Sequence, residues 1–72
     1  MVPLTVLNEC KNKTIEVHTS DQDVYTGVLY DFDIYVNISL RNAEYHELGA
    51  KSRELIGDTI IQGNFVTFVK II

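Results

Sequence analysis

The residues best suited to chemistry lie between positions 31 and 37, where Asp31, Asp33, Tyr35 and Asn37 alternate with apolar side chains. Two carboxylates could serve acid–base chemistry or hold a metal ion. Residues two apart on a strand have Cα atoms about 7 Å apart, which is too wide for sharing one proton, and no histidine, cysteine or third carboxylate stands nearby. We therefore predict a structural pair, in which Asp33 accepts backbone hydrogen bonds in a turn and Asp31 is solvated.

The other residue types that carry catalysis lack partners. His18 and His46 are far apart in the sequence, and neither has a second ligand at metal-binding spacing. Cys10 lies on the apolar side of a predicted helix, without a base beside it, which indicates a packing role. The sequence also has no phosphate-binding glycine loop. These observations predict a protein that is not an enzyme and that needs no metal and no cofactor.

Tyr35 and Asn37 together suit a different task. A flat ring and an amide, both on the polar side of an alternating segment, can hold a nucleic-acid base by stacking and hydrogen bonding. A second turn, Gln62-Gly63-Asn64, carries two more amide side chains. If the sheet curls, the two turns meet and form one base-binding site. An exposed strand tyrosine without a ligand is the plain alternative for Tyr35.

The elements that position these residues follow from patterns of apolar side chains. Pro3 suits the first turn of a helix, and the apolar spacing of Leu4, Leu7 and Cys10 predicts a short helix over residues 3–11. Alternation and turn residues predict strands over about 13–19, 23–33, 34–45, 54–62 and 65–72. The fold class is thus mainly β: a short N-terminal helix followed by a strongly bent five-stranded antiparallel sheet in a single domain.

Length shows that the second strand must bend. Eleven extended residues from Asp23 to Asp33 would span roughly 36 Å, whereas a chain of 72 residues has a radius of gyration of only about 11 Å. Gly27 is the expected bend, because a residue without Cβ tolerates coiling and close backbone approach. The apolar run from Val28 to Tyr30 indicates a bulge or burial on both faces. Tyr30 and Tyr45 are explained as cross-strand fillers.

The last strand predicts an oligomer. Its residues are apolar on both faces at a chain terminus, where an unpaired edge would aggregate unless a partner covered it. A domain this small buries only about 60% of its surface, and its one cysteine rules out an internal disulfide. Pairing with neighbouring subunits answers both problems. The expected interface residues are Phe65, Val66, Phe68 and Val69.

Charge and hydropathy exclude other classes. A net charge of −4 with six Lys and Arg residues argues against a protein that holds nucleic acid mainly by neutralising phosphates. We expect no DNA and no membrane as partners. Apolar runs are too short for a membrane helix, and the N-terminus lacks the features of a signal peptide. We expect a reducing compartment, the cytosol or nucleus.

Nearly the whole chain resembles a known family. The string Gly27-x-Leu29-x-x-Phe32-Asp33-x-Tyr35-x-Asn37-x-x-Leu40, followed later by Ile61-Gln62-Gly63-Asn64 and an apolar strand, is similar to the two-part Sm motif of the Sm and Sm-like (LSm) proteins. Within that family the chain looks most like the fourth LSm subunit, and the fifth is the nearest competitor.

The resemblance implies a bent barrel of the Sm fold whose subunits join edge to edge in a ring, the fourth strand of one pairing with the fifth of the next. It implies uridine-rich single-stranded RNA as ligand, with Tyr35 stacking on a uracil, Asn37 hydrogen-bonding it and Asp33 ordering the loop. Gln62, Gly63 and Asn64 complete the RNA-binding set. The resemblance implies that the partners are other LSm subunits in a hetero-heptameric ring. Such a ring would act in splicing with the U-six small nuclear RNA, or in messenger RNA decapping and decay. Its location would be the nucleus and the cytoplasm.

One position departs from the family pattern, because Gln62 stands where most members have arginine. The cation that would sandwich the base is absent there, and we expect weaker binding from this subunit alone. Two alternatives stay open: a homomeric Sm-like ring, and a monomeric SH3-like barrel that binds a peptide.

Overall fold

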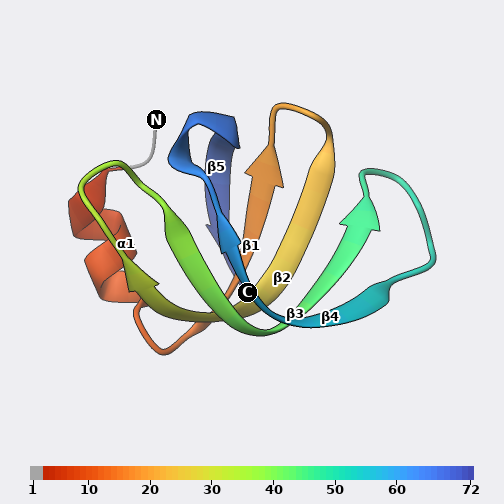
Figure 1. Ribbon diagram of the computed structural model, residues 1–72, viewed down its shortest axis with the longest axis horizontal. Helices are drawn as coiled ribbons and strands as arrows, with labels where there is room; N and C mark the ends of the chain where they lie inside the picture. The colour runs from red at the N-terminus through yellow and green to blue at the C-terminus, as the bar shows by residue number, and fades with distance from the viewer. Residues whose placement is uncertain (1–2) are drawn as a thin grey trace.

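The computed structural model describes residues 3–72, which form a short helix and a five-stranded sheet (Figure 1). Helix α1 spans Leu4–Cys10, and the strands are β1 (Thr14–Thr19), β2 (Asp23–Phe32), β3 (Ile38–Glu47), β4 (Glu54–Ile61) and β5 (Val66–Ile71). A 3-10 turn, η1, covers Gly63–Phe65. The predicted mainly β fold with a short N-terminal helix is confirmed.

The strands form one antiparallel sheet in the order β4-β3-β2-β1-β5. Strands β4 and β5 follow each other in the chain but lie at opposite edges of the sheet. Gly63-Asn64 is therefore not a hairpin turn between neighbouring strands. Neither residue has a positive φ, and the 3-10 turn carries the chain from one edge of the curled sheet to the other.

Gly27 marks the predicted bend. The register between β2 and β3 shifts between Thr26 and Val28, and Figure 1 shows the sheet curling strongly along its length. A Cβ at Gly27 would lie 3.0 Å from the Arg41 carbonyl oxygen and 3.1 Å from the Ala43 Cα. A side chain at this position would therefore push β2 and β3 apart by a few tenths of an ångström. The radius of gyration is 10.9 Å, in line with the expected value.

The third strand begins four residues later than the alternation predicted, at Ile38 instead of Ile34. Residues 34–37 form a turn in which Val36 has φ 63°, a conformation that β-branched residues rarely adopt. Ile34 was expected on the buried side of a strand and is 70% exposed, while Val36 is buried in the core. Hydrogen bonds that Asp33 accepts from the backbone of residues 35–37 favour the turn over the strand.

The other observed bounds differ from the expected ones by one or two residues. The helix begins at Leu4 with Pro3 in the preceding capping position and ends at Cys10. Asn12, two residues after the helix, has φ 68°, and its N–H donates to the Leu29 carbonyl. Strand ends commonly vary by this much.

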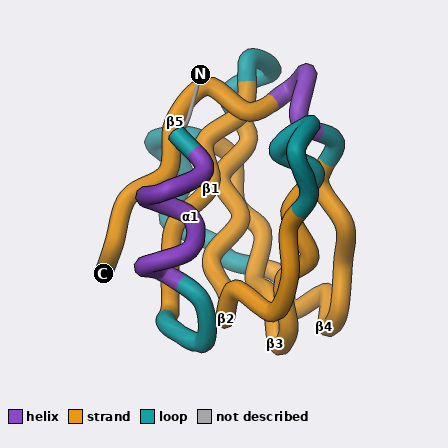
Figure 2. Tube along the Cα trace, turned by 90° about the vertical axis from the view of Figure 1, so that its left-hand side faces the viewer, coloured by secondary structure: helices purple, strands orange, loops and turns teal. Residues whose placement is uncertain are grey.

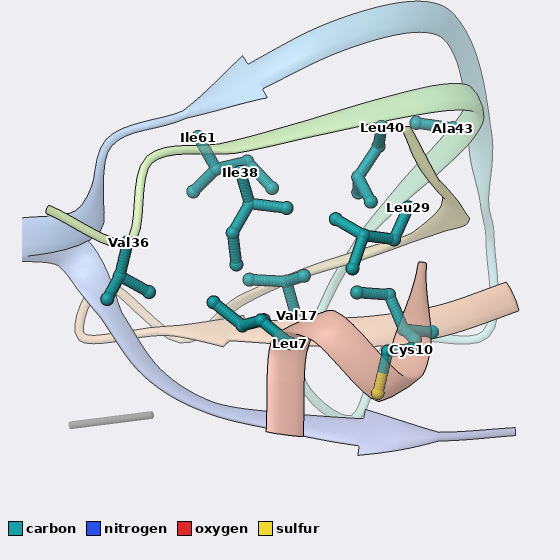
Figure 3. Packing of buried hydrophobic residues seen from close by; sticks show 10 residues of the cluster. Leu7, Cys10, Val17, Leu29, Val36, Ile38, Leu40, Ala43 and Ile61 are labelled. Carbon is teal, nitrogen blue, oxygen red and sulfur yellow. The ribbon is translucent and has the colours of Figure 1, made fainter. Parts of the chain in front are cut away.

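The core lies inside the curled sheet, and helix α1 stands along one side of the strands (Figure 2). Leu7 and Cys10 of the helix are fully buried and belong to one core cluster with side chains from four strands and the 34–37 turn (Figure 3). Burying one such leucine contributes about 1.5–3 kcal/mol. The members of the core are Leu7, Cys10, Ile15, Val17, Leu29, Val36, Ile38, Leu40, Ala43 and Ile61.

Two features are absent from residues 3–72. The described part of the chain contains no helix that is long and apolar enough to cross a membrane. It also contains no group of three or more His, Cys, Asp or Glu side chains placed to hold a metal ion.

Candidate functional site

The turn after β2 is built around the carboxylate of Asp33. Its Oδ1 accepts hydrogen bonds from the backbone N–H of Tyr35 at 2.9 Å and of Asn37 at 3.1 Å. The Val36 N–H donates to the Asp33 carbonyl at 3.0 Å. These bonds give acceptors to three backbone N–H groups of a turn in which Val36 is strained. Asp33 therefore orders the turn, as the sequence analysis expected.

The same bonds affect the ionisation of Asp33. The side-chain amide of Asn37, together with the backbone N–H groups of Asn37 and Tyr35, holds the pKa of Asp33 below its ordinary value of 3.8. The carboxylate is therefore ionised at neutral pH, where its two oxygens act as acceptors.

Asn37 joins the two predicted turns. Its Nδ2 donates to Asp33 Oδ2 at 3.0 Å, and its Oδ1 accepts from the Gly63 N–H at 2.8 Å. These two partners define which end of the amide is oxygen. The turns meet, as expected if the sheet curled. Since a primary amide has two N–H donors and an oxygen with two lone pairs, one N–H and one lone pair of Asn37 remain for a ligand.

Gly63 lies directly against the first turn. A Cβ at this position would stand 1.8 Å from the Tyr35 carbonyl oxygen and 2.9 Å from the Val36 carbonyl carbon. No side chain fits in that space. The glycine is required by close backbone approach, and the approach is what brings its N–H to Asn37.

The joined turns enclose an open hollow of about 560 Å³ beside the Tyr35 ring. Tyr35 is 73% exposed, and Asn64 is exposed on the opposite turn. Four of the six predicted RNA-binding residues, Tyr35, Asn37, Gly63 and Asn64, line this hollow. A fifth, Asp33, supports it through its hydrogen bond to Asn37. The residues that line the hollow are Ile34, Tyr35, Val36, Asn37, Gly63, Asn64 and Val66.

Gln62 is placed differently. It is exposed and lines a second hollow on the other side of Asn37 and Asn64, with Asp33 and Ser39 among its neighbours. The structure does not bring Gln62 into the Tyr35 hollow. No basic side chain lines either hollow in the described residues.

The predicted interface residues divide into two pairs. Phe65 and Phe68 are 41% and 50% exposed, and the Phe68 ring stacks on His18 with centroids 4.2 Å apart. Val66 and Val69 are half-buried and pack against the chain's own core. One edge of β5 pairs with β1, while no described strand pairs with its other edge.

Sequence reasoning missed two features. Ile34 was assigned to a buried strand face, but it lies exposed beside Tyr35 and lines the same hollow. The sequence pattern indicated no role for Arg41, whose guanidinium carbon lies 3.6 Å from the Tyr30 ring centroid. Because Leu40 is buried, the alternation along the strand places Arg41 on the same face as Ser39. This alternation was the signal in the sequence that could have identified Arg41.

Comparisons with known proteins agree with this geometry. A model of the LSM domain matches residues 5–71. The chain is similar to the U6 snRNA-associated Sm-like protein LSm6 of Chaetomium globosum, with 34% identity over 93% of this chain and 80% of the relative. It is 33% identical to a putative snRNP Sm-like protein of Methanococcoides burtonii, over 93% and 92% of the two chains. The LSM complex subunit LSM4 of Saccharomyces cerevisiae is 26% identical over 99% of this chain and 43% of the relative.

Solved structures show the same fold. An Sm protein of Pyrococcus abyssii in complex with a uridine heptamer superposes with a TM-score of 0.88 at 26% identity, covering 97% of each chain. A heptameric archaeal Sm protein superposes with a TM-score of 0.85 at 26% identity, covering 94% of this chain and 97% of the other. The relatives carry several subunit names, so the resemblance to the fourth LSm subunit stays a prediction.

Proposed function

The chain belongs to the LSM domain family, and from this premise we propose that it is one subunit of a ring that binds uridine-rich single-stranded RNA. The observation that carries this proposal is the Asn37 amide. By bonding Asp33 and Gly63 at once, it holds the exposed Tyr35 ring and the Asn64 amide around one hollow. A similar fold, the Sm protein of Pyrococcus abyssii, has been solved with a uridine heptamer.

Each residue has a defined task in this site. The Tyr35 ring stacks on the base, an interaction worth about 1–3 kcal/mol per base in single-strand binders. The free N–H and lone pair of Asn37 and the amide of Asn64 hydrogen-bond the base edge, which supplies selectivity. Asp33 orders the turn, Gly63 permits the close approach of the two turns, and Gln62 offers an amide to RNA that leaves the hollow.

The sheet edges support assembly into a ring. Strands β4 and β5 each have an edge that is not paired within the described chain. Leu55 on β4 is 73% exposed, and Phe68 and Ile71 on β5 are 50% and 52% exposed. Pairing β4 of one subunit with β5 of the next would satisfy both edges and cover these side chains. In this arrangement Phe65 and Phe68 pack across the interface, while Val66 and Val69 contribute backbone bonds.

We propose other LSm subunits as the companions, in a hetero-heptameric ring of nucleus and cytoplasm that acts in splicing or in messenger RNA decay. The similarity to LSm6 and LSM4 proteins supports this form. A homomeric ring is the second candidate, favoured by 33% identity over 92% of an archaeal Sm-like protein and by the heptameric archaeal structure.

Native mass spectrometry of the purified chain separates these forms. A closed ring of identical chains supports the homomeric candidate. A species that closes a ring only after LSm companions are added supports the heteromeric form. A chain that stays monomeric with and without companions contradicts both, and points instead to a monomeric peptide-binding barrel.

RNA binding is tested on the assembled ring by fluorescence anisotropy with uridine and adenosine heptamers. The wild type should prefer uridine, and Tyr35→Ala should weaken uridine binding by about 1–3 kcal/mol per altered site. Leu48→Ala is the matched control, because Leu48 is an exposed apolar residue that lies outside the Tyr35 hollow. Equal binding by the two variants would refute the site.

A further inference from the structure

The Tyr35 hollow continues into a groove along β3 and β4. The second hollow shares Asn37 and Asn64 with the first. A third hollow shares Ser39 and Ile60 with the second. Ser39 and Ile60 face each other across the two strands, so the three hollows form one continuous path. We name its far end the strand groove, lined by Tyr30, Ser39, Leu40, Arg41, Asp58, Thr59 and Ile60.

Tyr30 and Arg41 form a platform in the strand groove. The register between β2 and β3 shifts between Leu29 and Asp31, so Tyr30 has no cross-strand partner and is 47% exposed. Bulges of this kind re-aim a side chain. The Arg41 guanidinium lies over the Tyr30 ring at 3.6 Å. A guanidinium held this way presents a flat surface to a base and N–H donors to a phosphate.

The position of the Arg41 guanidinium is informative because no other basic side chain lines the three hollows in the described residues. Arg41 forms no ion pair with a described carboxylate, whereas Lys11 and Arg53 have acidic partners at 3.9 Å and 3.8 Å. Asp58, which also lines the strand groove, accepts a hydrogen bond from the Asn42 N–H. Arg41 is therefore available to a phosphate.

We propose that the strand groove binds the nucleotide that follows the one held at Tyr35, with Arg41 contacting its phosphate and the Arg41–Tyr30 platform stacking on its base. From Asn37, the residue before β3, to Arg41 on β3 the chain extends over roughly 13 Å, which a flexible single strand spans. The groove also supplies the positive charge that Gln62 does not. This inference rests on the proposed RNA-binding function, because it requires a strand anchored in the Tyr35 hollow.

The test compares Arg41→Gln with Lys51→Gln in the assembled ring. Both changes remove one positive charge from an exposed residue, but Lys51 lines none of the three hollows. Uridine heptamer binding should weaken about tenfold in Arg41→Gln, and the slope of log affinity against log salt should fall by about 0.7 per lost phosphate contact. Uridine, which carries no phosphate for Arg41 to contact and is held only in the Tyr35 hollow, should bind Arg41→Gln as it binds the wild type. Lys51→Gln should leave both ligands unaffected.

The outcomes separate the two levels of inference. If the heptamer binds Arg41→Gln and Lys51→Gln equally while Tyr35→Ala weakens it, the strand groove is refuted and the proposed function stands. If the wild-type ring does not bind uridine heptamer, the proposed function fails and the groove with it. If Arg41→Gln breaks the ring in native mass spectra, Arg41 serves assembly, and the groove is likewise refuted.

Discussion

Replacing Gly63 with alanine is the sharpest perturbation of the joined turns. The new Cβ would lie 1.8 Å from the Tyr35 carbonyl oxygen, and contacts under 3.0 Å are essentially never seen. The two turns must therefore separate by about 1.2 Å, which is the difference between these distances. A movement of that size takes the 2.8 Å bond between the Gly63 N–H and Asn37 beyond hydrogen-bonding range.

The cost follows from these two effects. Overpacking a close contact costs about 1–3 kcal/mol, and losing one hydrogen bond adds about 1 kcal/mol. We expect Gly63→Ala to lower the free energy of unfolding by about 2–4 kcal/mol, a large part of the roughly 4–11 kcal/mol typical of a chain of this length. Uridine binding should fall as well, because Asn37 loses the bond that positions it.

Urea unfolding and uridine heptamer anisotropy measure these two effects. Gly49→Ala is the matched control: a Cβ there meets nothing within 4 Å, and its only penalty is the positive φ of 84°. That penalty is about 1–2 kcal/mol and lies in the connector after β3, away from the Tyr35 hollow. Gly49→Ala should therefore leave RNA affinity unchanged.

The reasoning would be refuted if Gly63→Ala cost no more than Gly49→Ala and bound uridine as tightly as the wild type. Such a result would mean that the two turns can separate without consequence, and that Asn37 does not depend on Gly63 for its position.

Three further predictions concern the turn, the core and the edge. Hydrogen bonds hold the folded-state pKa of Asp33 below 3.8. The stabilisation that Asp33 gives the turn is therefore fully present above that pH and is lost as pH falls through the lowered value. The Tyr35 amide signal in NMR should follow this titration in the wild type and should not do so in Asp33→Asn. Leu7→Ala should lower the free energy of unfolding by about 2–5 kcal/mol in urea, since Leu7 is fully buried, whereas Leu48→Ala, at a position 58% exposed, should cost under about 0.5 kcal/mol. Phe68→Lys should release subunits from the ring in native mass spectra by placing a charge at the β5 edge, and Leu48→Lys should leave the ring intact; a stable Phe68→Lys ring would contradict the proposed edge pairing.

Some features could be predicted because a single local cause determines them. Gly27 was predicted as the bend, since the strand was too long for the molecule and a residue without Cβ tolerates close backbone approach. Asp33 was identified as a turn residue because a short carboxylate accepts nearby backbone N–H groups. Both predictions depend on residues within a few positions of each other.

Other features depend on contacts between distant segments. The apolar alternation of Ile34, Val36 and Ile38 predicted a strand, because period two cannot show that Asp33 accepts two N–H groups and draws these residues into a turn. The crossing from β4 to β5 depends on the curl of the whole sheet. The bond from Gly63 to Asn37 joins residues 26 positions apart, so the sequence indicated only that the turns could meet.

The central claim is that a uracil base occupies the hollow formed by the two joined turns. The most direct measurement is NMR of the assembled ring during titration with uridine heptamer, observing contacts between uracil protons and the Tyr35 ring and shifts of the Asn64 side-chain amide. We predict both, together with their loss in Tyr35→Ala. Saturable uridine binding with no change at Tyr35 or Asn64 would contradict the claim.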